Sequence, residues 1–407
     1  MKPSVVLSVV IIMLCGALCT VSAQTASVTP DGRPIVIPPS SIPHPGHIHT
    51  NYFFADPASW NPDGPPTGFE TPGSLACVYK LVPQVAGCPI GVATTVPTGG
   101  VGAIAIVDAG DYPTARFDLK TFSDYFGIPY DDANFKVIYA TKGNKKPQSC
   151  EITGWCGEET LDIEWAHAMA PAAKLFLVES ELCTTDPCNT DPTWNAVRVA
   201  SQLVAENGGG VISMSWGDDE WAQEVNFDHW MTTPGVVYFA ASGDGGIGQV
   251  IHPAVSPNVV AVGGTYFERE KNGDFKDEVY FGGGGGISQF EPRPSFQDSI
   301  EKIVGDWRAT PDVASDFCCG VVYSIMSGGW GAVGGTSWAS PTFAGISDAA
   351  GLLKKSSFDE HREIYSEYNN PKLYPREFFD ITQGDSACVK GWNVCGGIGS
   401  PRTYFGK

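Results

Sequence analysis

The apolar positions of this chain form short continuous runs that alternate with segments of helical periodicity. Such runs are typical of strands buried on both faces of a parallel sheet, where no solvent-facing positions interrupt them. The expected strands are residues 101–109, 173–179, 210–217, 235–243 and 258–264. Helical patterns at 158–170 and 194–206 separate several of these runs. The alternation predicts a doubly wound α/β domain with a mostly parallel sheet and helices on both faces.

The N-terminal segment, residues 1–23, has the layout of a secretory signal. Lys2 gives a positive start, an apolar run follows, and Val21-Ser22-Ala23 is a small-residue cleavage site. A membrane anchor is the alternative, but the run is shorter than the roughly 20 residues that a spanning helix needs. No later segment is apolar enough to span a bilayer. We therefore expect a secreted protein with no membrane contact after signal removal.

Residues 24–69 are rich in Pro, His, Ser and Gly and lack an apolar period. This composition predicts a poorly ordered leader or an extended arm. The HPGHIH stretch at 44–49 brings three histidines together, but a metal site would need further ligands. A solvated, pH-sensitive arm is the simpler interpretation.

Charge and cysteine content narrow the class of protein. The chain has 25 Lys and Arg against 45 Asp and Glu, giving a formal net charge of −20 and a pI near 4.6. This negative charge excludes nucleic acid as a partner. The excess of carboxylates also fits a protein that works at acid pH. Ten cysteines follow the signal, which in an oxidising compartment indicates disulfides. The close pairs are 77 with 88, 150 with 156, 183 with 188, and 388 with 395, while Cys318 and Cys319 either bond each other or join distant segments.

Glycine-rich stretches mark two further features. The GGGGG run at 282–286 has no following GK[ST], so a flexible or closely packed loop is expected in place of a phosphate cradle. The stretch GGTSWASPTFAG at 334–345 resembles the start of a helix that carries a nucleophilic serine in subtilisin-type peptidases. A nucleophilic serine needs a base. The chain has only seven histidines and no HGTH-like stretch, so the base must be sought elsewhere.

In EETLDIEWAHAMAP, Glu158 and Asp162 stand four residues apart at the start of a helical pattern, which places both carboxylates on one face. At acid pH such a pair can share a proton, with one pKa pushed up and the other down. Taken alone, the pair is better interpreted as an ordinary acidic first turn of a helix, since Asp and Glu favour helix N-termini.

Six motifs in order resemble those of the sedolisin family, the serine-carboxyl peptidases, which have a subtilisin-like fold and use Glu where subtilisin uses His. They are EETLD at 158–162, SWG at 215–217, AASGDGG at 240–246, GGGISQFEPRPSFQ at 284–297, PDV at 311–313 and GGTSWASP at 334–341. The resemblance runs from about residue 70 to the C-terminus. It implies a peptidase domain over 70–407, and it implies a propeptide far longer than residues 24–69.

The resemblance implies Ser337 as nucleophile, Glu158 as general base, Asp162 as the group that orients Glu158, and Asp244 in the oxyanion hole. The chemistry agrees. At about pH 4 a histidine with the reference pKa of about 6.5 is protonated and cannot accept the serine proton, whereas a glutamate near 4.3 can. Asp244 must stay protonated to donate to the oxyanion, which requires burial.

By the same analogy Ser215, Trp216 and Gly217 contact substrate. Trp216 and Asp108 extend the carboxylate network, and Trp216 is equally plausible as simple core or pocket wall. The family carries Glu where this chain has Asp108, and the shorter side chain reaches Asp162 less well. His167 lies five residues after Asp162 without a glycine-rich context, so we interpret it as a packed or surface histidine.

Near the C-terminus, FFDITQGD at 378–385 and VKGWN at 389–393 resemble the family's calcium loop. The implied Ca²⁺ ligands are Asp380, the carbonyls of Ile381, Val389 and Gly391, and Asn393. Asn393 replaces an expected Asp, and the lost negative charge should weaken calcium affinity.

We therefore expect a secreted, acid-acting serine endopeptidase that cleaves polypeptide substrates as a monomer, through an acyl-enzyme on Ser337. A tripeptidyl-peptidase of the same family is the first alternative. An inactive secreted binding module on this fold is the second, and intact Glu158, Asp162, Asp244 and Ser337 argue against it.

Overall fold

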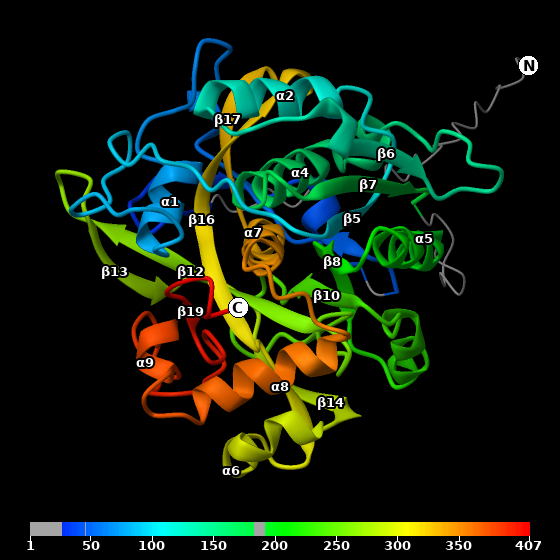
Figure 1. Cartoon of the computed structure of the whole chain (residues 1–407), viewed down its shortest axis with the longest axis vertical. Helices are drawn as coiled ribbons and strands as arrows, with labels where there is room; N and C mark the ends of the chain where they lie inside the picture. The colour runs from blue at the N-terminus through cyan, green and yellow to red at the C-terminus, as the bar shows by residue number, and fades with distance from the viewer. Residues whose placement is uncertain (1–26, 45, 183–191) are drawn as a thin grey trace, which may run out of the picture.

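The fold is a central, mostly parallel sheet with helices on both faces (Figure 1). The computed structural model describes residues 27–44, 46–182 and 192–407. Seven adjacent strands of the sheet are parallel, in the order β6 (Phe135–Tyr139), β7 (Lys174–Ser180), β5 (Ala103–Ala109), β8 (Gly210–Met214), β10 (Val236–Ala241), β12 (Val260–Arg269) and β16 (Val313–Ser324). Each predicted apolar run overlaps one of these strands, and the predicted fold class is confirmed.

The sheet continues beyond β16 with antiparallel strands. These are β17 (Gly329–Gly334), β4 (Phe53–Ala55), β2 (Pro34–Val36) and β1 (Ser27–Val28), while β13 (Phe275–Tyr280) pairs with β12. Shorter ladders join β3 (His49–Thr50), β9 (Trp216–Asp219) and β11 (Ile251–His252), then β14 (Gly286–Pro292) with β15 (Trp307–Thr310), and β18 (Phe378–Phe379) with β19 (Ser400–Pro401).

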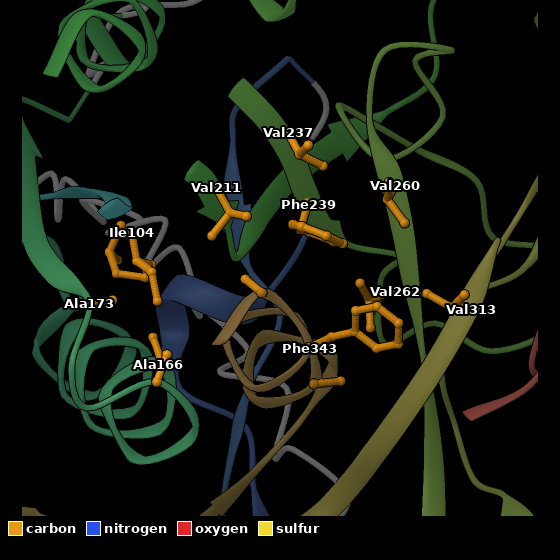
Figure 2. Close-up of a cluster of buried hydrophobic side chains, with 14 of the residues drawn as sticks. Ile104, Ala166, Ala173, Val211, Val237, Phe239, Val260, Val262, Val313 and Phe343 are labelled. Atoms are coloured by element: carbon orange, nitrogen blue, oxygen red, sulfur yellow. The ribbon is translucent and has the colours of Figure 1, made fainter. Parts of the chain in front are cut away.

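Alternate residues of each strand point to opposite faces, and both faces are covered by helices. On one face α2 (Ala115–Phe126), α4 (Cys156–Met169), α7 (Thr336–Ala349) and α8 (Ser357–Tyr368) pack on side chains such as those in Figure 2. On the other face α5 (Pro192–Glu206) packs on the intervening positions. The shorter helices are α1 (Pro72–Val78), α3 (Cys150–Thr153), α6 (Glu301–Val304) and α9 (Tyr374–Glu377). None of the helices in the described ranges is long and apolar enough to cross a membrane.

The leader departs from expectation. Its described residues, 27–44 and 46–69, include β1 to β4, and β4 pairs with β17 inside the main sheet. Poor order was therefore the wrong expectation for these residues, and the extended arm is the better description. The sheet edge formed by β17 supplies the hydrogen bonds that the leader cannot make internally.

Cysteine pairing follows the close spacings. The disulfides join Cys77 to Cys88, Cys150 to Cys156, Cys318 to Cys319, and Cys388 to Cys395. The expected pair 183 with 188 lies outside the described residues. The glycine run 282–286 is closely packed: a Cβ at Gly283, Gly284 or Gly285 would lie within 2.4 Å of neighbouring backbone.

Candidate active site

Ser337 lies in the first turn of α7, directly after the end of β17. It is fully buried, and its hydroxyl donates to the Ser215 carbonyl at 2.9 Å. Gly335 makes the entry to the helix possible, because its φ is 122° and a Cβ there would lie 2.1 Å from the Asn51 carbonyl oxygen. Gly345, at the far end of the motif, lets α7 approach α4 closely, since a Cβ would lie 2.7 Å from the Ala166 carbonyl.

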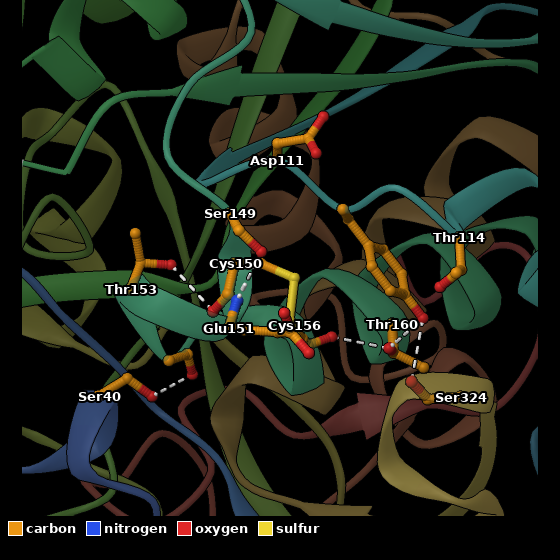
Figure 3. Close-up of a disulfide and its surroundings, with 12 residues drawn as sticks. Ser40, Asp111, Thr114, Ser149, Cys150, Glu151, Thr153, Cys156, Thr160 and Ser324 are labelled. Carbon is orange, nitrogen blue, oxygen red and sulfur yellow. Dashed lines mark hydrogen bonds between the residues drawn. A yellow bond between two sulfur atoms is a disulfide. The ribbon is translucent and has the colours of Figure 1, made fainter.

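Glu158 and Asp162 lie on the first two turns of α4, which packs against α7. The disulfide between Cys150 and Cys156 joins α3 to the start of α4, and Figure 3 shows it just ahead of Thr160. This link fixes the N-terminal end of the helix that carries the acidic pair. Thr160 adds hydrogen bonds to the Cys156 carbonyl and the Tyr112 hydroxyl, both at 2.7 Å.

Both carboxyl groups of the acidic pair are removed from water. Burial raises the pKa of Glu158 well above its usual range, and the Asp162 and Asp108 carboxylates add to the rise, while the Ser337 hydroxyl opposes it. Burial and Asp108 likewise raise the pKa of Asp162, which accepts a hydrogen bond from Ser215 Oγ at 2.7 Å. In this geometry the Ser337 hydroxyl points to Ser215 and must turn to reach Glu158. Neither Glu158 oxygen has a hydrogen-bond partner among the described residues, so Asp162 acts on Glu158 through its charge.

Asp108 and Trp216 lie beside this pair, but they do not extend it by hydrogen bonds. Burial raises the pKa of Asp108 to about 8, and its carboxyl group is without a hydrogen-bond partner among the described residues. The Trp216 indole donates to the Val107 carbonyl at 2.8 Å and packs against Trp194. Of the two interpretations of Trp216, its side chain fits the core one. Asp108 acts on Asp162 through charge alone.

Asp244 follows β10 and faces the residue before Ser337. Its Oδ1 accepts from the Thr336 backbone N–H at 2.8 Å and from the Thr336 hydroxyl at 2.7 Å. Burial raises the pKa of Asp244 to about 7 although these bonds favour the charged form. The carboxyl group is thus protonated in acid, and its hydrogen bonds hold it against Thr336, next to Ser337.

The leader passes through this site as an extended chain. Strand β3 pairs antiparallel with β9, placing His49 opposite Gly217 and Thr50 opposite Trp216. The next residue, Asn51, donates its N–H to Ser337 Oγ at 2.9 Å and accepts the Ser337 N–H at 3.0 Å. The chain then joins β17 through β4. Sequence reasoning missed this segment, because its partners are more than a hundred residues away.

The SWG stretch at 215–217 contacts the leader through its backbone. Gly217 and Trp216 present main-chain groups to an antiparallel strand, and the Ser215 hydroxyl bonds Asp162 at 2.7 Å and the Ser337 carbonyl at 3.1 Å. Of the three residues predicted to contact substrate, Trp216 and Gly217 pair here with the chain's own leader, while Ser215 bonds Asp162 and Ser337.

His167 is a packed histidine, as expected. It is 6 % exposed, packs edge-on against the Tyr130 ring, and has a pKa lowered to about 4 by burial. Glu158 and Asp162 lie at other positions of α4, whereas the His167 ring packs against Tyr130. Two more acids were missed: Glu159 is fully buried with its pKa raised well above normal by burial and by Glu179, whose own pKa burial raises to about 8.

The calcium-type loop brings its predicted residues together, but their orientation does not suit a cation. The side-chain nitrogen of Asn393 donates to the carbonyls of Ile381, Val389 and Gly391 at 3.0, 2.7 and 3.0 Å. An N–H group thus faces the oxygens that a Ca²⁺ ion would need. Elsewhere in the described ranges no cluster of three His, Cys, Asp or Glu side chains could hold a metal.

Comparison with known proteins agrees with this fold. The Subtilase family matches residues 140–364, which is more than half of the chain. Kumamolisin from Bacillus sp. (strain MN-32) is 29% identical over 341 residues, covering 73% of this chain and 58% of that protein. Sedolisin from Pseudomonas sp. (strain 101) is 26% identical over 62% of this chain and 47% of its own length. Human tripeptidyl-peptidase 1 is 32% identical over 48% of this chain and 41% of its own length.

The solved structure of Pseudomonas sedolisin, a serine-carboxyl proteinase complexed with pseudo-iodotyrostatin, superimposes with a TM-score of 0.64 at 21% identity, covering 82% of this chain and 95% of that one. The chain belongs to the subtilase family of serine-type peptidases. The resemblance to its sedolisin members, predicted from the six motifs, is confirmed. The chain spans about half the length of the curated relatives that it matches.

Proposed function

We propose that this protein is a secreted, acid-acting serine endopeptidase whose acyl-enzyme forms on Ser337. One observation carries the proposal: a single backbone residue, Asn51, contacts both the Ser337 hydroxyl and the Ser337 N–H while its chain lies along β9. A polypeptide substrate needs these same contacts, to a nucleophile, to an oxyanion donor and to an antiparallel strand. The disulfides fit an oxidising, secretory compartment.

In the proposed reaction Ser337 Oγ attacks the scissile carbonyl carbon while its proton passes to Glu158. Asp162 holds Glu158 in place and shares its proton. The oxyanion accepts from the Ser337 N–H and from protonated Asp244, and Glu158 then protonates the leaving amine. Water enters, is deprotonated by Glu158, and hydrolyses the Ser337 ester. The raised pKa of Asp244, about 7, keeps its carboxyl group protonated in acid, so that it can donate to the oxyanion there; this supports an acid-acting enzyme.

The leader also favours an endopeptidase over a tripeptidyl-peptidase. The chain stays beside β9 for more than three residues upstream of Asn51, since the Gly46 backbone and His47 both act on Asp218. A tripeptidyl-peptidase would need this end closed after three residues, to bind a free amino terminus.

The test is hydrolysis of denatured casein by the wild type and by Ser337→Ala at about pH 3 to 5, with products sized by mass spectrometry. We expect internal fragments of mixed length from the wild type and none from the variant. A ladder of tripeptides would favour the alternative, and equal cleavage by Ser337→Ala would overturn the nucleophile assignment.

A further inference from the structure

The loop between β18 and β19 holds one polar side chain at its centre. Asn393 is 3 % exposed, and the disulfide between Cys388 and Cys395 closes the loop around it. Its amide nitrogen lies between the three carbonyl oxygens of Ile381, Val389 and Gly391. Three backbone acceptors from separate positions thus converge on a single donor.

The orientation of this amide is fixed by the backbone. Asn393 Oδ1 accepts from the N–H groups of Cys395 and Gly396 at 2.9 and 3.2 Å. Turning the amide over would set its oxygen against three carbonyl oxygens and its NH₂ against two N–H donors, so every contact would become repulsive. An oxygen ligand from Asn393 into the cage is therefore excluded in this fold.

The neighbouring carboxylate is also engaged. Both oxygens of Asp380 accept from the Gly391 N–H, at 3.1 and 3.0 Å. The Tyr374 hydroxyl donates to the Ile398 carbonyl at 2.8 Å, so the Gly391 N–H is the hydrogen-bond donor that holds this carboxylate. The loop's carbonyls and its Asp380 carboxylate thus have partners from the protein, without a cation.

We propose that the Asn393 amide takes the place of a calcium ion in this loop, so that the loop closes without metal, and that Asn393→Asp creates a calcium site. The amide supplies positive N–H groups to the three carbonyls that would otherwise need a cation. A carboxylate at the same position has no N–H group, so three carbonyl oxygens would face a negative charge until a divalent ion entered.

The experiment uses the full chain with the Ser337→Ala change, to avoid self-digestion, at a near-neutral pH where carboxylates bind metal. Thermal unfolding is followed in excess EDTA and over a calcium chloride titration. We expect the Tm with Asn393 intact to be the same in both. Asn393→Asp should melt several degrees lower in EDTA and recover saturably with calcium, because only the folded state binds the ion.

Asn370→Asp is the matched control, since it adds the same charge at an exposed Asn outside the loop and should show no calcium response. Calcium-dependent stabilisation of the chain with Asn393 intact would overturn the proposal. So would Asn393→Asp if it folds but ignores calcium. If that variant folds only when calcium is present, the proposal is supported, and the EDTA measurement on the chain with Asn393 intact decides independently.

Discussion

Asp244 has an environment that keeps an aspartate neutral in acid. Burial raises its pKa to about 7, against the opposing hydrogen bonds from Thr336. The protonated form donates to an oxyanion, and the charged form repels one. Activity that depends on Asp244 must therefore fall as pH rises through about 7.

Asp244→Asn tests this directly. The amide donates at any pH, so we expect kcat/KM to be roughly tenfold lower at the optimum and to lose less activity above it than the wild type does. The measurement is kcat/KM against pH for both proteins, with folding checked by circular dichroism at each point. If the two alkaline limbs superimpose, another group titrates there.

The site carboxylates Glu158, Asp162 and Asp244 could be predicted from the sequence because the order of the motifs identifies them. Asp162 and Glu158 stand one helical turn apart, and Asp244 follows an apolar run. The burial of Glu159 and Glu179 could not be predicted from the sequence, because nothing local shows that α4 is enclosed on every side by other elements. Their pKa values depend on tertiary packing.

At the scale of elements, the strands of the parallel core were predictable because burial on both faces leaves continuous apolar runs. The leader strands β3 and β4 could not be predicted, because they are only two and three residues long and pair with the distant strands β9 and β17. A strand stabilised only by distant backbone partners carries little local signal.

The leader's course predicts self-cleavage between Asn51 and Tyr52. The Asn51 carbonyl accepts the Ser337 N–H at 3.0 Å, which aligns that peptide bond with the nucleophile. Full-length chain incubated in acid should gain a new N-terminus at Tyr52, read by N-terminal sequencing or mass spectrometry. The Ser337→Ala chain should stay intact under the same conditions.

Asn51→Pro is the second arm of this test, because proline lacks the N–H that Asn51 donates to Ser337. We expect slower cleavage at this bond. A wild-type chain that digests casein while its own leader remains uncut, or is cut first at another bond, would contradict the predicted register.

Across the whole molecule, buried carboxyl groups with raised pKa set the pH dependence of stability. Burial brings the pKa of Asp108 and Glu179 to about 8, and that of Glu278 and Glu360 to about 7. In the unfolded chain these groups ionise near pH 4. The folded state keeps the protons longer, so stability is greatest below about pH 4 and is lost as pH rises through 7 to 8.

One buried ion pair works in the opposite direction. Arg308 and His361 hold the pKa of Asp312 below its usual range, with Asp312 and Arg308 both fully buried. Its stabilisation is present above the unfolded pKa and is lost only as pH falls through the lowered folded value. The Arg308–Asp312 ion pair therefore still stabilises the fold at about pH 4, where the buried carboxyl groups with raised pKa are protonated.

We expect the Tm of the Ser337→Ala chain to be highest near pH 4 and to fall by several degrees or more towards pH 8. Differential scanning calorimetry at constant ionic strength measures this. A Tm that stays level or rises over that interval would show that the buried carboxyl groups do not hold their protons in the folded state.

The most direct test of the account asks whether a carboxylate or a histidine is the base. It compares kcat/KM on one peptide substrate over about pH 3 to 8 for the wild type, Glu158→Gln and His167→Ala, with folding checked for each. We expect an acid-centred bell for the wild type, a loss of about 10²- to 10⁴-fold at every pH for Glu158→Gln, and little change for His167→Ala. Retained activity in Glu158→Gln together with loss in folded His167→Ala would contradict it.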